Sequence, residues 1–190
     1  MTTFSVCVYC GARPGGDPAF GDAAEATGRA IGKEGWRLVY GAGDVGLMGR
    51  VARAAQAAGA DTFGVIPQHL LALEVGKRDL SRFIVTETMH ERKKIMVMNA
   101  DAIVVLPGGA GTLDEFFEVL TWRQLGLHDK PIFLLGPDGF WAPLETLLDH
   151  IVATGFAGET MRDSVQACGS VAALVDCLRE ARSRLSRAPE

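Results

Sequence analysis

The sequence has 190 residues, 48% of them hydrophobic and 22% charged, with a formal net charge of −4 at pH 7. This length fits one domain with a full hydrophobic core, and the composition excludes disordered, collagen-like and coiled-coil chains. The acidic balance gives no support for binding nucleic acid, because phosphate backbones select basic surfaces. Glycine stands out with 23 residues, about 12% of the chain against a usual ~7%, and such an excess is expected in turns.

Short β-branched and aliphatic runs alternate with longer stretches in which apolar residues recur at helical spacing. In chain order the predicted elements are strand 4–10, helix 19–34, strand 36–40, helix 48–58, strand 61–66, strand 83–87, helix 89–99, strand 102–106, helix 113–124, strand 131–135, helix 140–154, strand 165–168 and helix 171–185. The alternation predicts an α/β fold: a single doubly wound, Rossmann-like domain with a mainly parallel sheet of about six to seven strands flanked by helices. We expect this domain to span residues 1–182 and to be followed by a flexible tail, residues 183–190.

The four cysteines do not form a metal or redox pattern. Cys7 and Cys10 have CxxC spacing, but strand alternation would point them to opposite faces, so we interpret them as packing residues. The scattered histidines also lack ligand spacing, and no metal is expected. The first residues lack a basic signal-peptide region, and no apolar run approaches the ~20 residues of a membrane span. We therefore expect a cytoplasmic protein that binds no membrane.

Three glycine clusters directly follow predicted strands, at residues 11–16, 41–49 and 107–112. A strand, a glycine turn and a helix N-terminus form an anion site, because outward N–H groups and the helix dipole favour negative charge. The alternative is that the glycines only make tight turns. That alternative is weakest for the third cluster, because Thr112, Asp114 and Glu115 share its helical turn.

The second cluster also matches the GxGxxG dinucleotide fingerprint, through Gly41, Gly43 and Gly46. That fingerprint expects an acidic residue at the end of the next strand, whereas Asp61 lies at the beginning of that strand. An NAD-dependent oxidoreductase is therefore a less favoured alternative.

A charged run, His90-Glu91-Arg92-Lys93-Lys94, opens the helix predicted at 89–99. Glu91 and Lys94 fit a solvated helix face, and Met96 and Met98 fit the core. Arg92 would lie at a strand's carboxyl end beside the third glycine loop, where a guanidinium can bind phosphate or a carboxylate with two hydrogen bonds.

Glu115 lies three residues after Thr112, so one interpretation is a capping box at the helix N-terminus. The functional alternative is a carboxylate within a phosphate-binding turn. Such a carboxylate suits chemistry in which positive charge develops on a sugar beside a bound phosphate.

Four segments together resemble one family, the Lonely Guy (LOG) proteins. Residues 107–115 match its PGGxGTxxE signature, residues 89–93 its MHERK segment, residues 46–49 its GLMG turn and residues 121–126 its TWxQLG stretch. The resemblance implies an enzyme that hydrolyses the N-glycosidic bond of nucleoside 5′-monophosphates. Its substrates would be cytokinin riboside 5′-monophosphates and AMP, and its products the free base and ribose 5-phosphate. No cofactor is implied: the family's older label, lysine decarboxylase, would need a pyridoxal-binding lysine that cannot be identified here.

The resemblance also implies site residues and a homodimer whose site lies near the interface, with contacts close to residues 113–125. The catalytic pair would be Arg92 and Glu115. Arg92 would either keep Glu115 ionised or bind the substrate. The substrate-binding residues would be Glu74, Arg92, Lys93, Gly108, Gly109, Ala110, Gly111, Thr112, Leu113, Asp114, Glu115 and Thr121, with further contacts from Gly11, Gly43, Gly46 and Met89.

The sequence departs from the family pattern at Ala42, where a glycine is usual, and at Ala12, where serine is frequent. Ala42 would change how closely the backbone approaches a ligand. Ala12 lacks the serine hydroxyl that could contact a phosphate. A base pocket could be lined by Met89, Met98, Phe116 and Trp122. The functional alternative is a non-catalytic nucleotide-binding or carrier protein of the same fold.

Overall fold

The computed structural model describes residues 3–71 and 76–187. Its elements are β1 (Ser5–Tyr9), α1 (Pro18–Lys33), β2 (Arg37–Tyr40), α2 (Gly46–Ala57), β3 (Asp61–Pro67), α3 (Gln68–Leu71), β4 (Arg82–Thr86), α4 (Met89–Met98), β5 (Ala102–Val105), α5 (Ala110–Gln124), β6 (Ile132–Leu135), the 3-10 turn η1 (Pro137–Gly139), α6 (Ala142–Ala153), α7 (Glu159–Asp163), β7 (Val165–Cys168) and α8 (Val171–Leu185).

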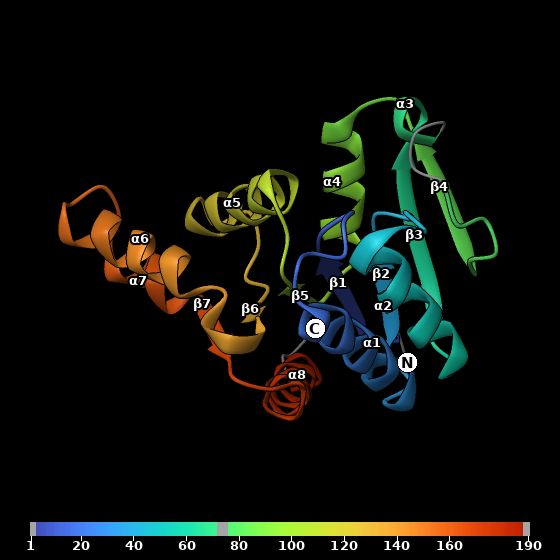
Figure 1. The fold of residues 1–190 in the computed structure, drawn as a ribbon. Helices are drawn as coiled ribbons and strands as arrows, with labels where there is room; N and C mark the ends of the chain where they lie inside the picture. The colour runs from blue at the N-terminus through green and yellow to red at the C-terminus, as the bar shows by residue number, and fades with distance from the viewer. Residues whose placement is uncertain (1–2, 72–75, 188–190) are drawn as a thin grey trace.

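The strands form one parallel sheet in the order β4-β3-β2-β1-β5-β6-β7 (Figure 1). The predicted doubly wound α/β fold is confirmed. The chain winds outward in one direction from β1 to β4 and in the other from β5 to β7. The order therefore reverses between β1 and β5, and the crevice beyond the carboxyl ends of these two strands is where such folds bind ligands.

Helices cover both faces of the sheet (Figure 1). Val6 and Val8 of β1 point into a core shared with α1, α2 and α8, whereas Cys7 and Tyr9 point into a second core shared with α4 to α7. Cys10 lies in the first core, so the prediction that Cys7 and Cys10 face opposite sides is confirmed. A strand buried on both faces has no polar side to alternate with, which explains the continuous apolar runs in the sequence.

Three short elements, α3, η1 and α7, were not predicted, because three to five residues are too few to display helical periodicity. The expectation that Met98 is a core residue is wrong, since 70% of it is exposed. Met96 is fully buried. Met98 lies two positions further along the same helix, and residues at this spacing point to different faces of a helix. Helix α8 continues to Leu185, so the first three residues of the expected tail are helical.

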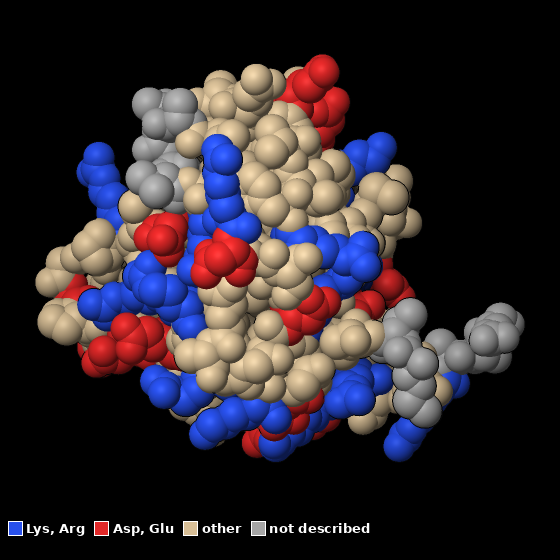
Figure 2. All heavy atoms as spheres, turned by 90° about the vertical axis from the view of Figure 1, so that its right-hand side faces the viewer, with Lys and Arg blue, Asp and Glu red and all other residues tan. Residues whose placement is uncertain are grey.

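Figure 2 shows lysine and arginine interspersed with aspartate and glutamate on the side of the molecule that lies to the right in Figure 1. Within residues 3–71 and 76–187, no helix combines the length and the apolar character needed to cross a membrane. The same part of the chain contains no group of three histidine, cysteine, aspartate or glutamate residues that could hold a metal ion.

Candidate active site

A cavity of about 480 Å³ lies at the switch point between β1 and β5. The first and third glycine loops, the start of α2, the start of α4 and the segment after β6 form its wall. Nine of the predicted site residues line it: Gly11, Met89, Arg92, Gly108, Gly109, Ala110, Gly111, Thr112 and Glu115. Residues more than 100 positions apart in the sequence thus meet at one site.

The third glycine loop opens helix α5 toward this cavity. Gly109 is the N-cap, and no side chain of the described residues caps this terminus. The first N–H groups of a helix have no partner within it, so they are available to a ligand. A β-carbon at Gly109 or Gly111 would have no heavy atom within 4 Å, which means that both positions face open space. The loop therefore presents bare backbone to the cavity.

The capping-box interpretation of Glu115 is wrong. Because the helix begins at Ala110, Thr112 is its third residue and Glu115 lies further inside the helix. The capping box is found instead in α4, where the Thr88 hydroxyl accepts from the Glu91 N–H and Glu91 binds the Thr88 N–H. Glu91 is exposed, as its interpretation as a solvated residue predicts.

Arg92 is fixed from the sheet side of the cavity. Its Nε donates to the carbonyl of Val65 at 3.2 Å, and its Nη2 donates to the carbonyl of Gly41 at 3.2 Å. A β-carbon at Gly41 would overlap this Nη2 atom, so the guanidinium can lie here only because residue 41 is glycine. Only 5% of Arg92 is exposed.

The remaining nitrogen of Arg92, Nη1, lies 3.8 Å from Oε1 of Glu115. Glu115 is 8% exposed and reaches the cavity from α5. Burial strengthens the attraction between opposite charges, because little water screens them. The structure thus brings together the two residues of the predicted catalytic pair, Arg92 from α4 and Glu115 from α5.

Cys10 also lines the cavity, close to this pair. Burial raises the pKa of the Cys10 thiol well above its ordinary value, and the negative charge of Glu115 raises it further. Because its pKa is raised, Cys10 is a neutral thiol at physiological pH. A neutral thiol is a poor nucleophile, since the thiolate is the reactive form. The described lining of the cavity therefore includes the carboxylate of Glu115 and the guanidinium groups of Arg13 and Arg92, but no activated thiol.

Lys93 of α4 forms ion pairs with two carboxylates of α5. Its Nζ atom binds Asp114 Oδ2 at 2.9 Å and Glu118 Oε1 at 3.1 Å, which joins α4 to α5. Burial alone would lower the pKa of Lys93, but the hydrogen bonds to the two carboxylates outweigh burial and raise it. Lys93 is not among the described residues that line the cavity.

Five other predicted residues, Gly43, Gly46, Leu113, Asp114 and Thr121, also lie outside the described cavity lining, and Glu74 lies outside the described residues. Gly46 has a positive φ of 56°, and a β-carbon there would overlap the backbone of Ala12. Its glycine allows the first and second loops to touch. Asp61 begins β3, as expected from the argument against an NAD site.

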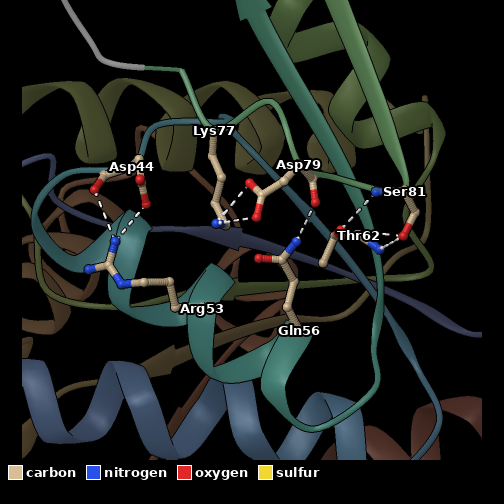
Figure 3. Close-up of polar contacts among 7 residues, drawn as sticks. All are labelled: Asp44, Arg53, Gln56, Thr62, Lys77, Asp79 and Ser81. Carbon is tan, nitrogen blue, oxygen red and sulfur yellow. Dashed lines mark hydrogen bonds and ion pairs between the residues drawn. The ribbon is translucent and has the colours of Figure 1, made fainter.

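Gly43 directly precedes Asp44, and Figure 3 shows the polar contacts of Asp44 with Arg53 of α2 and those of the neighbouring segment around Lys77 and Asp79. Gly43 pairs with Gly76 in an isolated bridge, and the Lys77 N–H donates to the Ala42 carbonyl at 3.0 Å. The following residues are held by Gln56, which donates to the Asp79 carbonyl at 2.6 Å (Figure 3). The second glycine loop thus anchors the chain that leads into β4.

Sequence reasoning missed several residues of the cavity wall, above all Arg13, Phe20 and Phe140. Phe20 and Phe140 form an edge-to-face pair with ring centroids 5.2 Å apart. A local sequence pattern cannot predict a contact between segments so far apart in the chain. Arg13 could have been predicted as a site residue, since it lies inside a glycine loop that follows a strand.

Of the residues expected to line a base pocket, only Met89 lines this cavity. Phe116 is in the core, and Met98 and Trp122 line a separate groove.

Comparison with known proteins is consistent with this geometry. A family model described as "Possible lysine decarboxylase" matches residues 48–178. The chain is 42% identical over 179 residues to the cytokinin riboside 5′-monophosphate phosphoribohydrolase of Rhodococcoides fascians, covering 94% of this chain and 90% of that one. The chain belongs to the LOG family. A rice member, the cytokinin riboside 5′-monophosphate phosphoribohydrolase LOG of Oryza sativa subsp. japonica, is 42% identical, with 92% of this chain and 72% of that one covered.

Solved structures show that this LOG protein shares its fold with carrier proteins. The molybdenum cofactor carrier protein of Chlamydomonas reinhardtii matches with a TM-score of 0.74 and 20% identity, over 96% of this chain and 99% of that one. The molybdenum cofactor binding protein of Rippkaea orientalis matches with a TM-score of 0.72 and 23% identity, over 95% and 98%. At such identities the likeness concerns the fold alone.

Proposed function

We propose that this LOG protein hydrolyses the N-glycosidic bond of cytokinin riboside 5′-monophosphates and of AMP, releasing the base and ribose 5-phosphate. Membership of the family makes it a hydrolase of N-glycosidic bonds. The observation that carries the finer proposal is the buried Arg92–Glu115 pair, which lines the same cavity as the uncapped N-terminus of α5.

In this proposal the 5′-phosphate binds at the third glycine loop. The open positions at Gly109 and Gly111 leave room for phosphate oxygens beside the first N–H groups of α5, and the helix dipole favours the anion. Gly11, Gly108, Ala110 and Thr112 complete this end of the cavity. Binding the phosphate fixes the ribose relative to the catalytic pair.

Glu115 acts on the ribose in the proposed mechanism. As the bond from C1′ to the base nitrogen breaks, positive charge develops on the sugar, and a carboxylate beside it lowers the barrier electrostatically. The oxygen of a water molecule, oriented by Glu115, forms the new bond to C1′. The water molecule gives up one proton as this bond forms and the departing base takes up one proton, so that the free base and ribose 5-phosphate result.

Arg92 acts through Glu115 in this mechanism. Two of its nitrogens are engaged by the carbonyls of Val65 and Gly41, and the third faces Glu115. This arrangement supports the role of holding the carboxylate ionised and oriented over that of binding the phosphate. The environment of a buried carboxylate without its cation would favour the neutral acid.

We also propose that the protein forms a homodimer through α4 and α5. Between them lies a groove of about 670 Å³ that includes Met98 and Leu127, which are 70% and 68% exposed, and Trp122. Exposed apolar side chains of this kind are frequent at subunit contacts. A contact here would bring a second subunit next to the helices that carry Arg92, Glu115 and Thr121.

The test is incubation of the purified protein with AMP and with prenylated AMP, followed by chromatography of the free base and of ribose 5-phosphate. The proposal predicts equal amounts of both products. The corresponding nucleosides, which lack the phosphate, serve as control and should remain intact. Nucleotide binding without base release would contradict hydrolysis and favour the carrier alternative.

A further inference from the structure

The charge balance of the cavity points to one more functional residue, on the condition that its ligand is the nucleoside monophosphate of the proposed function. A phosphate monoester carries between one and two negative charges at neutral pH, since its second pKa is about 6. Among the described lining residues the charged side chains are Arg13, Arg92 and Glu115.

Arg92 does not meet this demand. Its guanidinium already donates to two backbone carbonyls and faces Glu115 at 3.8 Å. The positive charge of Arg92 and the negative charge of Glu115 offset each other. The cavity would therefore be electrically neutral without Arg13, although the proposed ligand is an anion.

Arg13 is in the right place to supply the missing charge. It belongs to the first glycine loop, which touches the third loop through a hydrogen bond from the Gly11 N–H to the Pro107 carbonyl at 2.9 Å. Arg13 is exposed, and its side chain has no ion pair or hydrogen bond with any of the residues that the structure describes. Its guanidinium is thus available to a ligand.

The loop that carries Arg13 is fixed on both sides. At Gly15, φ is +78°, and a β-carbon would press against the ring of Phe20. On the other side Gly46 packs against the backbone of Ala12 and Arg13. Both contacts depend on glycine. A fixed backbone limits the entropy that is lost when the side chain of Arg13 closes on a ligand.

We propose that Arg13 binds the 5′-phosphate of the substrate, from the first glycine loop, so that the phosphate lies between its guanidinium and the N-terminus of α5. A guanidinium presents paired donors that match phosphate oxygens. The interaction is made in the bound substrate and in the transition state alike. Arg13 therefore governs affinity and the preference for phosphorylated ligands, whereas Glu115 governs the chemical step.

The experiment compares the wild type with Arg13→Ala and Arg13→Lys by calorimetric titration with ribose 5-phosphate and with adenosine, which lacks the phosphate. Arg29→Ala, which removes an exposed arginine outside the described lining of this cavity, is the matched control. For Arg13→Ala we expect the affinity for ribose 5-phosphate to fall about 10- to 100-fold, as for a charge-assisted hydrogen bond. Arg13→Lys should recover part of the loss, and adenosine binding should be unchanged in all variants.

Steady-state kinetics with AMP add a second readout. Arg13→Ala should raise KM by a similar factor and leave kcat within about 3-fold, because uniform binding does not change the chemical step. Wild-type affinity of Arg13→Ala for ribose 5-phosphate would overturn the role of Arg13 while leaving hydrolysis intact. Arg13-dependent binding in a protein that releases no base would instead overturn the proposed function and uphold Arg13.

Discussion

The guanidinium of Arg92 fills the space in which a side chain at residue 41 would begin, and its Nη2 donates to the carbonyl of Gly41 at 3.2 Å. This relationship explains a glycine that is neither in a left-handed conformation nor in contact with the cavity. The absence of a side chain at residue 41 allows Arg92 to reach Glu115.

Gly41→Ala should therefore impair catalysis more than folding. The new methyl group meets the end of a long side chain, which can move, so the loss of stability should be about 1–2 kcal/mol. Moving Arg92 away from Glu115 should lower kcat at least ~10-fold, since a misplacement of about 1 Å in an active site can cost up to ~100-fold. Gly158→Ala is the control, because its new methyl group would meet only the Thr160 hydroxyl, at an ordinary contact distance of 3.8 Å. Full activity of Gly41→Ala would contradict the role of Arg92.

Cys10 tests whether the reaction uses a thiolate nucleophile, which the proposed mechanism does not. Because burial raises the pKa of its thiol, Cys10→Ala should keep kcat within about 3-fold. The wild-type thiol should also resist alkylation by iodoacetamide at pH 7.5. Loss of activity on alkylation of Cys10, at unchanged folding, would indicate a thiolate mechanism instead.

Lys93 offers a test of the contact between α4 and α5. Lys93→Met leaves the half-buried carboxylate of Glu118 without its lysine partner. Unfolding by urea should show a loss of up to about 3 kcal/mol, the low end for a broken buried pair, because Glu118 is only partly buried and Asp114 is largely exposed. Lys93→Arg should retain most of the stability. Equal stability of Lys93→Met and the wild type would show that the pair does not join the helices.

The same pair gives a pH dependence whose direction follows from the raised pKa of Lys93. A cation with a raised pKa in the folded state contributes its full stabilisation below the ordinary lysine value of 10.5, and loses it as the pH rises through the folded value. The stability difference between wild type and Lys93→Met should therefore be constant from pH 7 to 9 and shrink above that ordinary value. A difference that grows with alkaline pH would contradict this pairing.

Ala42 has a left-handed backbone with φ of 58°, at the position where the family resemblance implies a glycine. Ala42→Gly should relieve strain of about 1–2 kcal/mol but lose a buried methyl group and gain unfolded-state entropy, so the free energy of unfolding should change by less than about 1 kcal/mol. Ala42→Val should destabilise by more than about 2 kcal/mol, since a branched side chain fits this conformation poorly. Because Ala42 is buried outside the described cavity lining, Ala42→Gly should not alter KM.

Much of the fold could be predicted from the sequence, because buried parallel strands and amphipathic helices leave different periodicities. The boundary of α5 could not be predicted: Gly108, Gly109 and Gly111 indicate a loop, yet the helix begins at Ala110. Gly111 is the only one of these three glycines inside the helix, and a single glycine costs only about 1 kcal/mol in a helix of 15 residues. The early start of the helix is also why Glu115 faces the cavity and does not cap.

The candidate site was predictable where it consists of contiguous motifs, such as the third glycine loop and the MHERK segment. Arg92 and Glu115 were found in this way, and the structure brings them together. Phe20 and Phe140 could not be found, because their contact depends on the order of strands in the sheet. Met98 shows the opposite error: its residue type indicates core, but its helix face is exposed.

The central claim is that Glu115 carries out the chemical step in a cavity that binds the nucleotide without it. The most direct test measures both quantities on Glu115→Gln, which keeps the shape of the side chain and removes its charge: calorimetric affinity for AMP, and release of adenine from AMP by chromatography. We predict affinity within about 3-fold of the wild type and a fall in kcat of at least ~1,000-fold, as expected for loss of an electrostatic catalytic group. Adenine release at the wild-type rate by a folded Glu115→Gln protein would contradict the mechanism.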